Sequence, residues 1–101
     1  MHVLLCTISP SDSEAFLRKL LDARLVACGN IVGGVRSLYR WEGAIQDEPE
    51  DLLVMETAAD DLDATIASIR ALHPYDVPKI LAVAPAAVLP SYLAWVRSHT
   101  T

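Results

Sequence analysis

Two cysteines and one histidine are the side chains of this chain best suited to bind a soft or borderline metal ion. Cys6 lies in an apolar run near the N-terminus, Cys28 begins a second apolar stretch, and His73 directly precedes Pro74. Two thiolates and an imidazole suit copper or zinc. The three residues are far apart and show no local metal-binding spacing such as Cys-x-x-Cys. Only the fold could bring them together.

Each of these side chains also has a purely structural interpretation. A free cysteine often packs as a small hydrophobe, and this is the favoured interpretation of Cys6 inside HVLLCTIS. Cys28, two residues before Asn30, fits either interpretation. His73 ends a predicted helix, so it is a ligand, a pH-sensitive group or a cationic cap favoured by the helix dipole.

Composition narrows the class of protein. The chain has 101 residues, which predicts a single domain over 1–101, and 52% of them are hydrophobic. Its net charge of −5 argues against nucleic acid and anionic membranes as partners, because both attract basic proteins. No apolar run approaches the roughly 18 residues of a membrane span. We therefore expect a cytoplasmic protein with reduced cysteines, and we find no catalytic motif that predicts an enzyme.

Hydrophobic periodicity predicts an α+β fold. Short apolar, β-branched runs predict strands, whereas apolar residues at helical spacing predict helices. The predicted strands cover 2–9, 27–41, 44–57 and 79–84, and the predicted helices cover 11–25, 60–73 and a short segment after Pro90. This order, β-α-β-β-α-β with a C-terminal helix, is typical of the ferredoxin-like split βαβ arrangement with an antiparallel sheet.

The two central strands predict a β-ribbon that is too long for its own domain. They meet at the Glu42-Gly43 turn. A strand over 27–41 would span about 50 Å at ~3.3 Å per residue, whereas a compact domain of this size is only roughly 30–35 Å across. The ribbon therefore overhangs the domain or bends at Gly33-Gly34. An overhang leaves backbone groups unpaired, and another copy of the chain is the simplest cover.

Aromatic and arginine side chains cluster where such an interface is expected. Along the first ribbon strand the odd positions are apolar, including Ile31, Val35, Tyr39 and Trp41, and they predict one face turned to the core or to another subunit. The alternative is ordinary core packing with polar tips at the surface. Arg36 and Arg40 alternate with these residues and could pair with the acidic run 47–51. The candidate interface or pocket residues are Arg36, Tyr39, Arg40, Trp41, Tyr75, Tyr92 and Trp95.

Four segments, taken together, resemble one known family. They are Leu5-Cys6-Thr7, then LVACGNI followed by GVRSLYRWEG over 25–43, ALHPYDVP over 71–78, and Tyr92-Leu93-Ala94-Trp95. A small-residue–Cys strand, a Ser-x-Tyr-x-Trp-x-Gly hairpin and a His-Pro-Tyr-x-x-Pro turn occur in that order. On these motifs the chain resembles the CutA divalent-cation tolerance proteins along nearly its whole length.

The resemblance implies a ferredoxin-like fold, a homotrimer built through the ribbons, no enzymatic activity and a link to divalent metals, copper in particular. It places Cys6, Cys28 and His73 at positions associated with metal binding. CutA proteins also resemble PII signalling proteins, so a small-molecule sensor with a ligand site between subunits is the alternative function. The chain departs from the family at Gly29, Gly33 and Glu56, where a bulkier aliphatic residue, proline and lysine are usual.

Overall fold

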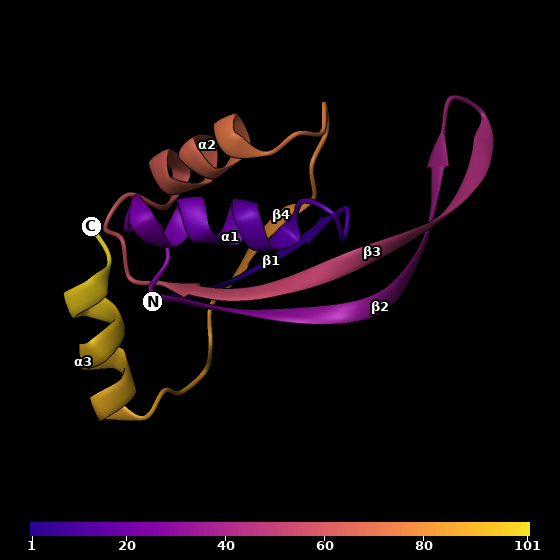
Figure 1. The fold of residues 1–101 in the computed structure, drawn as a ribbon. Helices are drawn as coiled ribbons and strands as arrows, with labels where there is room; N and C mark the ends of the chain where they lie inside the picture. Colours follow the sequence, from indigo (N-terminus) through magenta and orange to yellow (C-terminus); the bar gives the residue numbers. More distant parts are fainter.

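The predicted order of elements is confirmed by a computed structural model that describes residues 1–101 (Figure 1). The four strands form one antiparallel sheet in the order β2-β3-β1-β4, as expected for the ferredoxin-like class. The elements are β1 (His2–Ile8), α1 (Ser13–Asp22), β2 (Cys28–Trp41), β3 (Ala44–Thr57), α2 (Leu62–Leu72), β4 (Ile80–Val83) and α3 (Pro90–His99).

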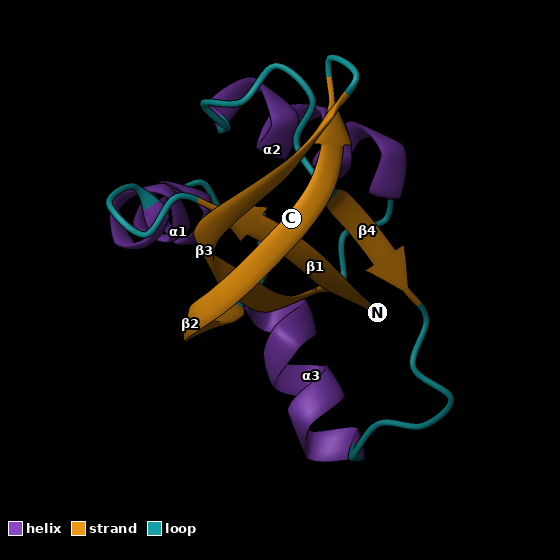
Figure 2. Ribbon diagram, turned by 90° about the vertical axis from the view of Figure 1, so that its right-hand side faces the viewer, coloured by secondary structure: helices purple, strands orange, loops and turns teal.

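The two faces of the sheet have different neighbours. Helices α1 and α2 cover one face, and α3 lies on the other side near one end of the sheet (Figures 1 and 2). The core fills the space between the sheet and α1 and α2. Its members are Leu4, Cys6, Ile8, Phe16, Leu17, Leu20, Val26, Leu53, Met55 and Ile69. We call the other side, which carries Leu5, Val54 and Leu81, the open face of the sheet.

Local backbone chemistry sets the ends of the helices. Helix α1 stops earlier than its predicted end at residue 25, because Arg24 adopts a left-handed conformation with φ of 57°. Helix α2 begins after Asp61, whose side chain accepts a hydrogen bond from the backbone N–H of Ala64 at 3.0 Å. None of the helices combines the length and the apolar character that crossing a bilayer requires.

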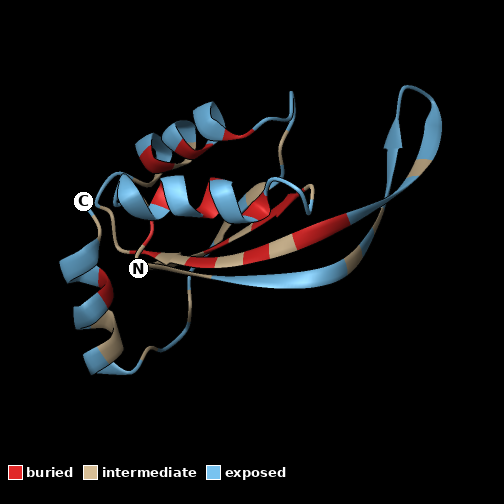
Figure 3. Cartoon of the chain, viewed as in Figure 1, coloured by how far each residue is buried: buried red, intermediate tan, exposed pale blue.

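The ribbon formed by β2 and β3 overhangs the domain, as its length predicts. The molecule measures 44 × 25 × 22 Å. Strand β1 pairs with β3 only between Asp51 and Thr57, so the outer half of the ribbon has no further strand beside it. This outer half is almost entirely exposed (Figure 3). Leu38 and Ile45 are 61% and 70% exposed there, which leaves an apolar surface without cover within one chain.

A β-bulge at Gly33-Gly34 interrupts the ribbon where it leaves the domain. Val32 pairs with Leu52, whereas Val35 pairs with Glu50, so β2 contains one extra residue. Gly34 takes a φ of +73°, which glycine adopts without strain. The extra residue reverses the alternation of side chains along β2. The prediction that the odd positions share one face is therefore wrong.

Candidate functional site

Cys6 is part of the hydrophobic core. It lies on the helix-covered face between Leu53 of β3 and Ile80 of β4, and it has no exposed surface. Its thiol donates a weak hydrogen bond to the carbonyl oxygen of Thr7 at 3.7 Å. Burial, helped by the negative charge of Glu50, raises the pKa of the Cys6 thiol to about 12. At neutral pH Cys6 is a protonated packing residue.

His73 uses both ring nitrogens within the fold. Its Nδ1 accepts a hydrogen bond from the backbone N–H of Tyr75 at 3.1 Å, so the proton resides on Nε2, which donates to the carbonyl oxygen of Thr7 at 3.0 Å. The ring also makes edge contacts with Phe16 and Tyr75. Burial lowers the pKa of His73. His73 is therefore neutral, and its side chain connects α1, β1 and the turn after α2. Neither ring nitrogen has a lone pair free for a metal.

Cys28 has a different environment from the other two. It lies directly opposite Glu56 in the β2–β3 ladder, on the open face, and it is only partly buried. Tyr92 of α3 donates a hydrogen bond from its hydroxyl to Oε1 of Glu56 at 2.8 Å. The other carboxylate oxygen of Glu56, Oε2, is buried and has no hydrogen-bond partner. We call Cys28, Glu56 and Tyr92 the Cys28 cluster.

One chain does not bring the three predicted metal residues together. Cys6 points to the helix-covered face, and Cys28 points to the open face, because their β3 partners are Leu53 and Glu56, three positions apart in the alternating strand. No three side chains of His, Cys, Asp or Glu are placed to hold a metal within the protomer. Of the predicted ligands, only Cys28 is accessible, and only its sulfur is free to bind a metal ion.

Two residues of the acidic run 47–51 are buried at the root of the ribbon. Glu50 and Asp51 are 7% and 8% exposed. The Tyr75 hydroxyl donates to Oε2 of Glu50 at 2.9 Å, and the Ser13 hydroxyl donates to Oδ2 of Asp51. Burial, followed by the bond to Glu50, raises the pKa of Tyr75 above its usual range. Alternation alone could not reveal this cluster, because its donors come from distant segments.

The predicted interface residues fall into three separate places. Tyr75 is at the root of the ribbon, and Tyr92 stacks on Trp95 in α3 with ring centroids 5.7 Å apart. The others lie on the outer ribbon, where Tyr39 and Trp41 are 42% and 44% exposed. The predicted pairing of Arg36 with the acidic run is confirmed, because two nitrogens of its guanidinium donate to the carboxylate of Asp47. Arg40 forms no ion pair within the chain.

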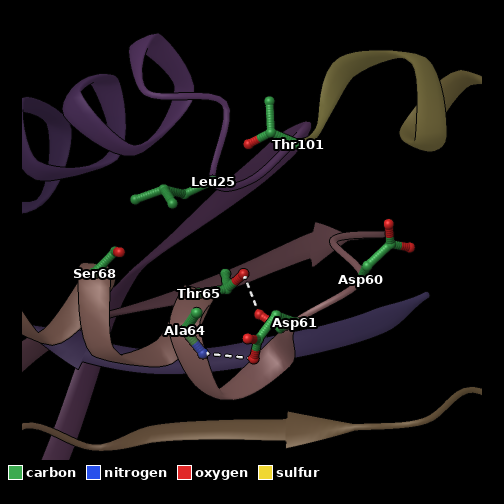
Figure 4. Close-up of a pocket in the computed structure, with 7 residues that line it drawn as sticks. All are labelled: Leu25, Asp60, Asp61, Ala64, Thr65, Ser68 and Thr101. Carbon is green, nitrogen blue, oxygen red and sulfur yellow. Dashed lines mark hydrogen bonds between the residues drawn. The ribbon is translucent and has the colours of Figure 1, made fainter.

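A shallow hollow of about 310 Å³ lies beside the start of α2 (Figure 4). Two of its polar groups serve the local structure. The side chain of Asp61 caps the helix, and the Thr65 hydroxyl donates to the backbone oxygen of Asp61 at 3.0 Å. The lining residues are Leu25, Asp60, Asp61, Ala64, Thr65, Ser68 and Thr101. Asp61 and Thr65 are thus engaged within the fold, and the hollow contains no group of three side chains that could hold a metal ion.

Comparison with known proteins decides the family. The sequence profile described as CutA1 divalent ion tolerance protein matches residues 1–99. The chain belongs to the CutA1 divalent ion tolerance protein family. The divalent-cation tolerance protein CutA of Thermus thermophilus is 39% identical over 101 residues, which cover 98% of this chain and 97% of that protein. The resemblance seen in the sequence motifs is thereby confirmed.

Solved CutA structures share the whole fold. The structure of the divalent cation tolerance protein from Thermus thermophilus matches with a TM-score of 0.90 at 37% identity, covering 99% of this chain and 98% of that chain. The PII-like protein CutA from Nostoc sp. PCC 7120 matches with a TM-score of 0.92 at 29% identity, covering 100% and 98%. The fold of this CutA1-family chain is therefore PII-like.

Proposed function

We propose that this CutA1-family chain acts in the response to divalent metal ions as a non-enzymatic homotrimer that binds copper. Family membership supports the metal link, since the Thermus relative is named a divalent-cation tolerance protein. That name describes tolerance and no reaction, which supports a non-enzymatic role. The cytoplasm remains the predicted location, and copper remains the predicted metal.

The observation that supports an oligomer is the apolar surface that the ribbon and the sheet leave exposed. The outer halves of β2 and β3 expose Leu38, Trp41 and Ile45, and the open face exposes Leu81 and Val83, which are 51% and 50% accessible. Apolar surface exposed at several places on a small chain points to contact with another protein. Copies of the chain that pack ribbon against sheet would bury it in an obligate interface. The number three comes from the family resemblance.

Sedimentation velocity of the purified chain at micromolar concentration tests the assembly. We expect one species with three times the 11.0 kDa protomer mass, with and without added copper. A folded species at the protomer mass would overturn the trimer, because the ribbon would then be stable without cover.

Copper binding is tested by calorimetric titration of the wild-type chain and two variants. Cys28→Ala should weaken copper binding, since Cys28 is the accessible thiol, and His73→Ala should change it little, because both nitrogens of His73 already have partners. A free-thiol count after each titration separates binding from oxidation by copper. Undiminished binding by Cys28→Ala would exclude this cysteine.

A PII-like small-molecule sensor is the second candidate. Its support is the likeness to the Nostoc protein that is described as PII-like, and this is an analogy of fold. A thermal-shift screen with nucleotides and organic anions separates the two candidates. A large shift with one metabolite and none with copper would favour the sensor, and the opposite result would favour the metal response.

A further inference from the structure

The Cys28 cluster places a thiol and a carboxylate side by side. Cys28 and Glu56 are direct cross-strand partners, and such partners have Cβ atoms about 4.5–5.5 Å apart on the same face of a sheet. Tyr92 approaches both from α3. Its hydroxyl holds Oε1 of Glu56, and the Cys28 thiol contributes after burial and Glu56 to raising the pKa of Tyr92. The three side chains therefore share one small space.

Oε2 of Glu56 has no hydrogen-bond donor within this space. A buried carboxylate oxygen without a donor is unfavourable by about 1–3 kcal/mol, and it calls for a proton, a cation or a donor from elsewhere. No lysine or arginine of the chain forms an ion pair with Glu56. The comparable carboxylate of Glu50 also accepts a tyrosine hydroxyl but leaves no buried oxygen unpartnered. The orphaned oxygen is thus specific to the site beside Cys28.

We propose that Cys28 and Glu56 together bind a divalent cation of the zinc class, with Tyr92 positioning the carboxylate. This inference deepens the proposed metal response and rests on it for the choice of a divalent cation. Glu56 adds an oxygen ligand that neither the sequence motifs nor the predicted set of Cys6, Cys28 and His73 includes.

The donor chemistry selects this class of ion. Zinc binds thiolate sulfur at about 2.3 Å and carboxylate oxygen at about 2.0–2.2 Å, separations that adjacent cross-strand side chains can span. A mixed sulfur and oxygen pair suits borderline divalent ions, whereas copper(I) prefers sulfur ligands alone. On binding, the Cys28 thiol releases its proton, and thiolate and carboxylate together balance the charge of the ion. Water or a neighbouring copy completes the coordination.

Cobalt(II) is a spectroscopic probe for this site, because a thiolate ligand gives a sulfur-to-cobalt charge-transfer band in the near ultraviolet. We expect the wild-type chain to develop the band and Zn²⁺ to displace it. Cys28→Ser should abolish the band, and Glu56→Gln should weaken cobalt affinity at least tenfold. Glu50→Gln is the matched control, since it changes a carboxylate on the same strand that also accepts a tyrosine hydroxyl, and it should leave cobalt affinity unchanged.

A second measurement needs no variant. Saturating Zn²⁺ should slow alkylation of Cys28 by iodoacetamide at least tenfold, as followed by mass spectrometry of the intact chain. Unchanged alkylation together with no cobalt band in the wild type would overturn the site. The inference would also fail if Glu56→Gln bound cobalt as tightly as the wild type.

The experiments distinguish a failure of this inference from a failure of the proposed function. Copper binding that depends on Cys28 but not on Glu56 would leave the metal response standing and overturn the inference. A Glu56→Gln variant that changes the sedimenting mass, in a chain without a cobalt band, would show that a neighbouring copy satisfies Oε2. That result would also overturn the metal site.

Discussion

The backbone N–H of Tyr75 donates a hydrogen bond to Nδ1 of His73 at 3.1 Å, and the two rings meet edge to face with centroids 4.6 Å apart. The same Tyr75 holds Glu50 at the root of the ribbon through its hydroxyl. The end of α2 is thereby connected to the ribbon through two residues. The fold thus uses the His-Pro-Tyr turn to fix the position from which the ribbon leaves the domain.

This connection predicts a pH dependence of stability. Burial lowers the pKa of His73 from 6.5, although the Thr7 carbonyl and the charges of Glu50 and Asp12 act in the opposite direction. The unfolded chain therefore binds a proton at higher pH than the folded chain. The contribution of neutral His73 is fully present above about pH 6.5 and is lost as the pH falls through its folded pKa. Urea unfolding between pH 7.5 and 5.5, at fixed protomer concentration, should show falling stability.

His73→Gln is the variant that isolates this effect. Glutamine does not titrate, so the decline of unfolding free energy between pH 7.5 and 5.5 should be shallower than in the wild type. His99→Gln changes an exposed histidine and should retain the wild-type decline. Equal slopes for all three proteins would show that His73 does not couple folding to protonation.

Loss of the Tyr75 hydroxyl should destabilise the root of the ribbon. In Tyr75→Phe the Glu50 carboxylate, which is 7% exposed, loses its one side-chain donor. We expect a decrease of about 1–3 kcal/mol in the free energy of unfolding. Tyr39→Phe is the control, because the Tyr39 hydroxyl makes no hydrogen bond within the chain and its removal should cost little. Chemical denaturation of both variants distinguishes a specific donor from a general loss of tyrosine polarity.

The fold was accessible to sequence reasoning because its signals are local. Leu17 and Leu20 repeat at helical spacing, and both proved to be buried on the inner side of α1. The Glu42-Gly43 turn places both residues at positive φ, the geometry of a tight hairpin. The end of α1 was missed because a left-handed conformation at Arg24, an ordinary helix former, has no sequence signature.

The site was less accessible because it depends on strand register. Continuing the register of the outer ribbon through Gly33-Gly34 would set Cys28 opposite Thr57, on the same face as Cys6. The bulge shifts the pairing by one residue, and Cys28 instead faces Glu56 on the open face. Two adjacent glycines indicate a flexible position, but they do not show whether one strand gains an extra residue there. The placement of Cys6 and Cys28 on opposite faces of the sheet therefore depends on strand pairing, which the sequence pattern alone does not predict.

The bulge itself gives a prediction with an internal control. Gly34 has a φ of +73°, so Gly34→Ala forces an L side chain into the left-handed region and should destabilise the chain by about 1–2 kcal/mol. Gly33 has an ordinary φ, and an added Cβ would meet only Oδ1 of Asp51 at 3.7 Å. Gly33→Ala should therefore be neutral or stabilise by up to about 1 kcal/mol. Similar unfolding midpoints for both variants would contradict the assigned bulge geometry.

The outer ribbon should determine assembly more than folding. Trp41 and Tyr39 contribute little to the core of their own chain, because both remain more than 40% exposed on the overhang. Replacing Trp41 with alanine, or Tyr39 with glutamate, removes apolar contact area or places a charge in the expected interface, and interfaces lose most when aromatic anchors are lost. We expect sedimentation to show dissociation at concentrations where circular dichroism still reports native secondary structure. Ser37→Ala, on the same strand, should leave the wild-type mass. An intact oligomer in both aromatic variants would place the interface elsewhere on the chain.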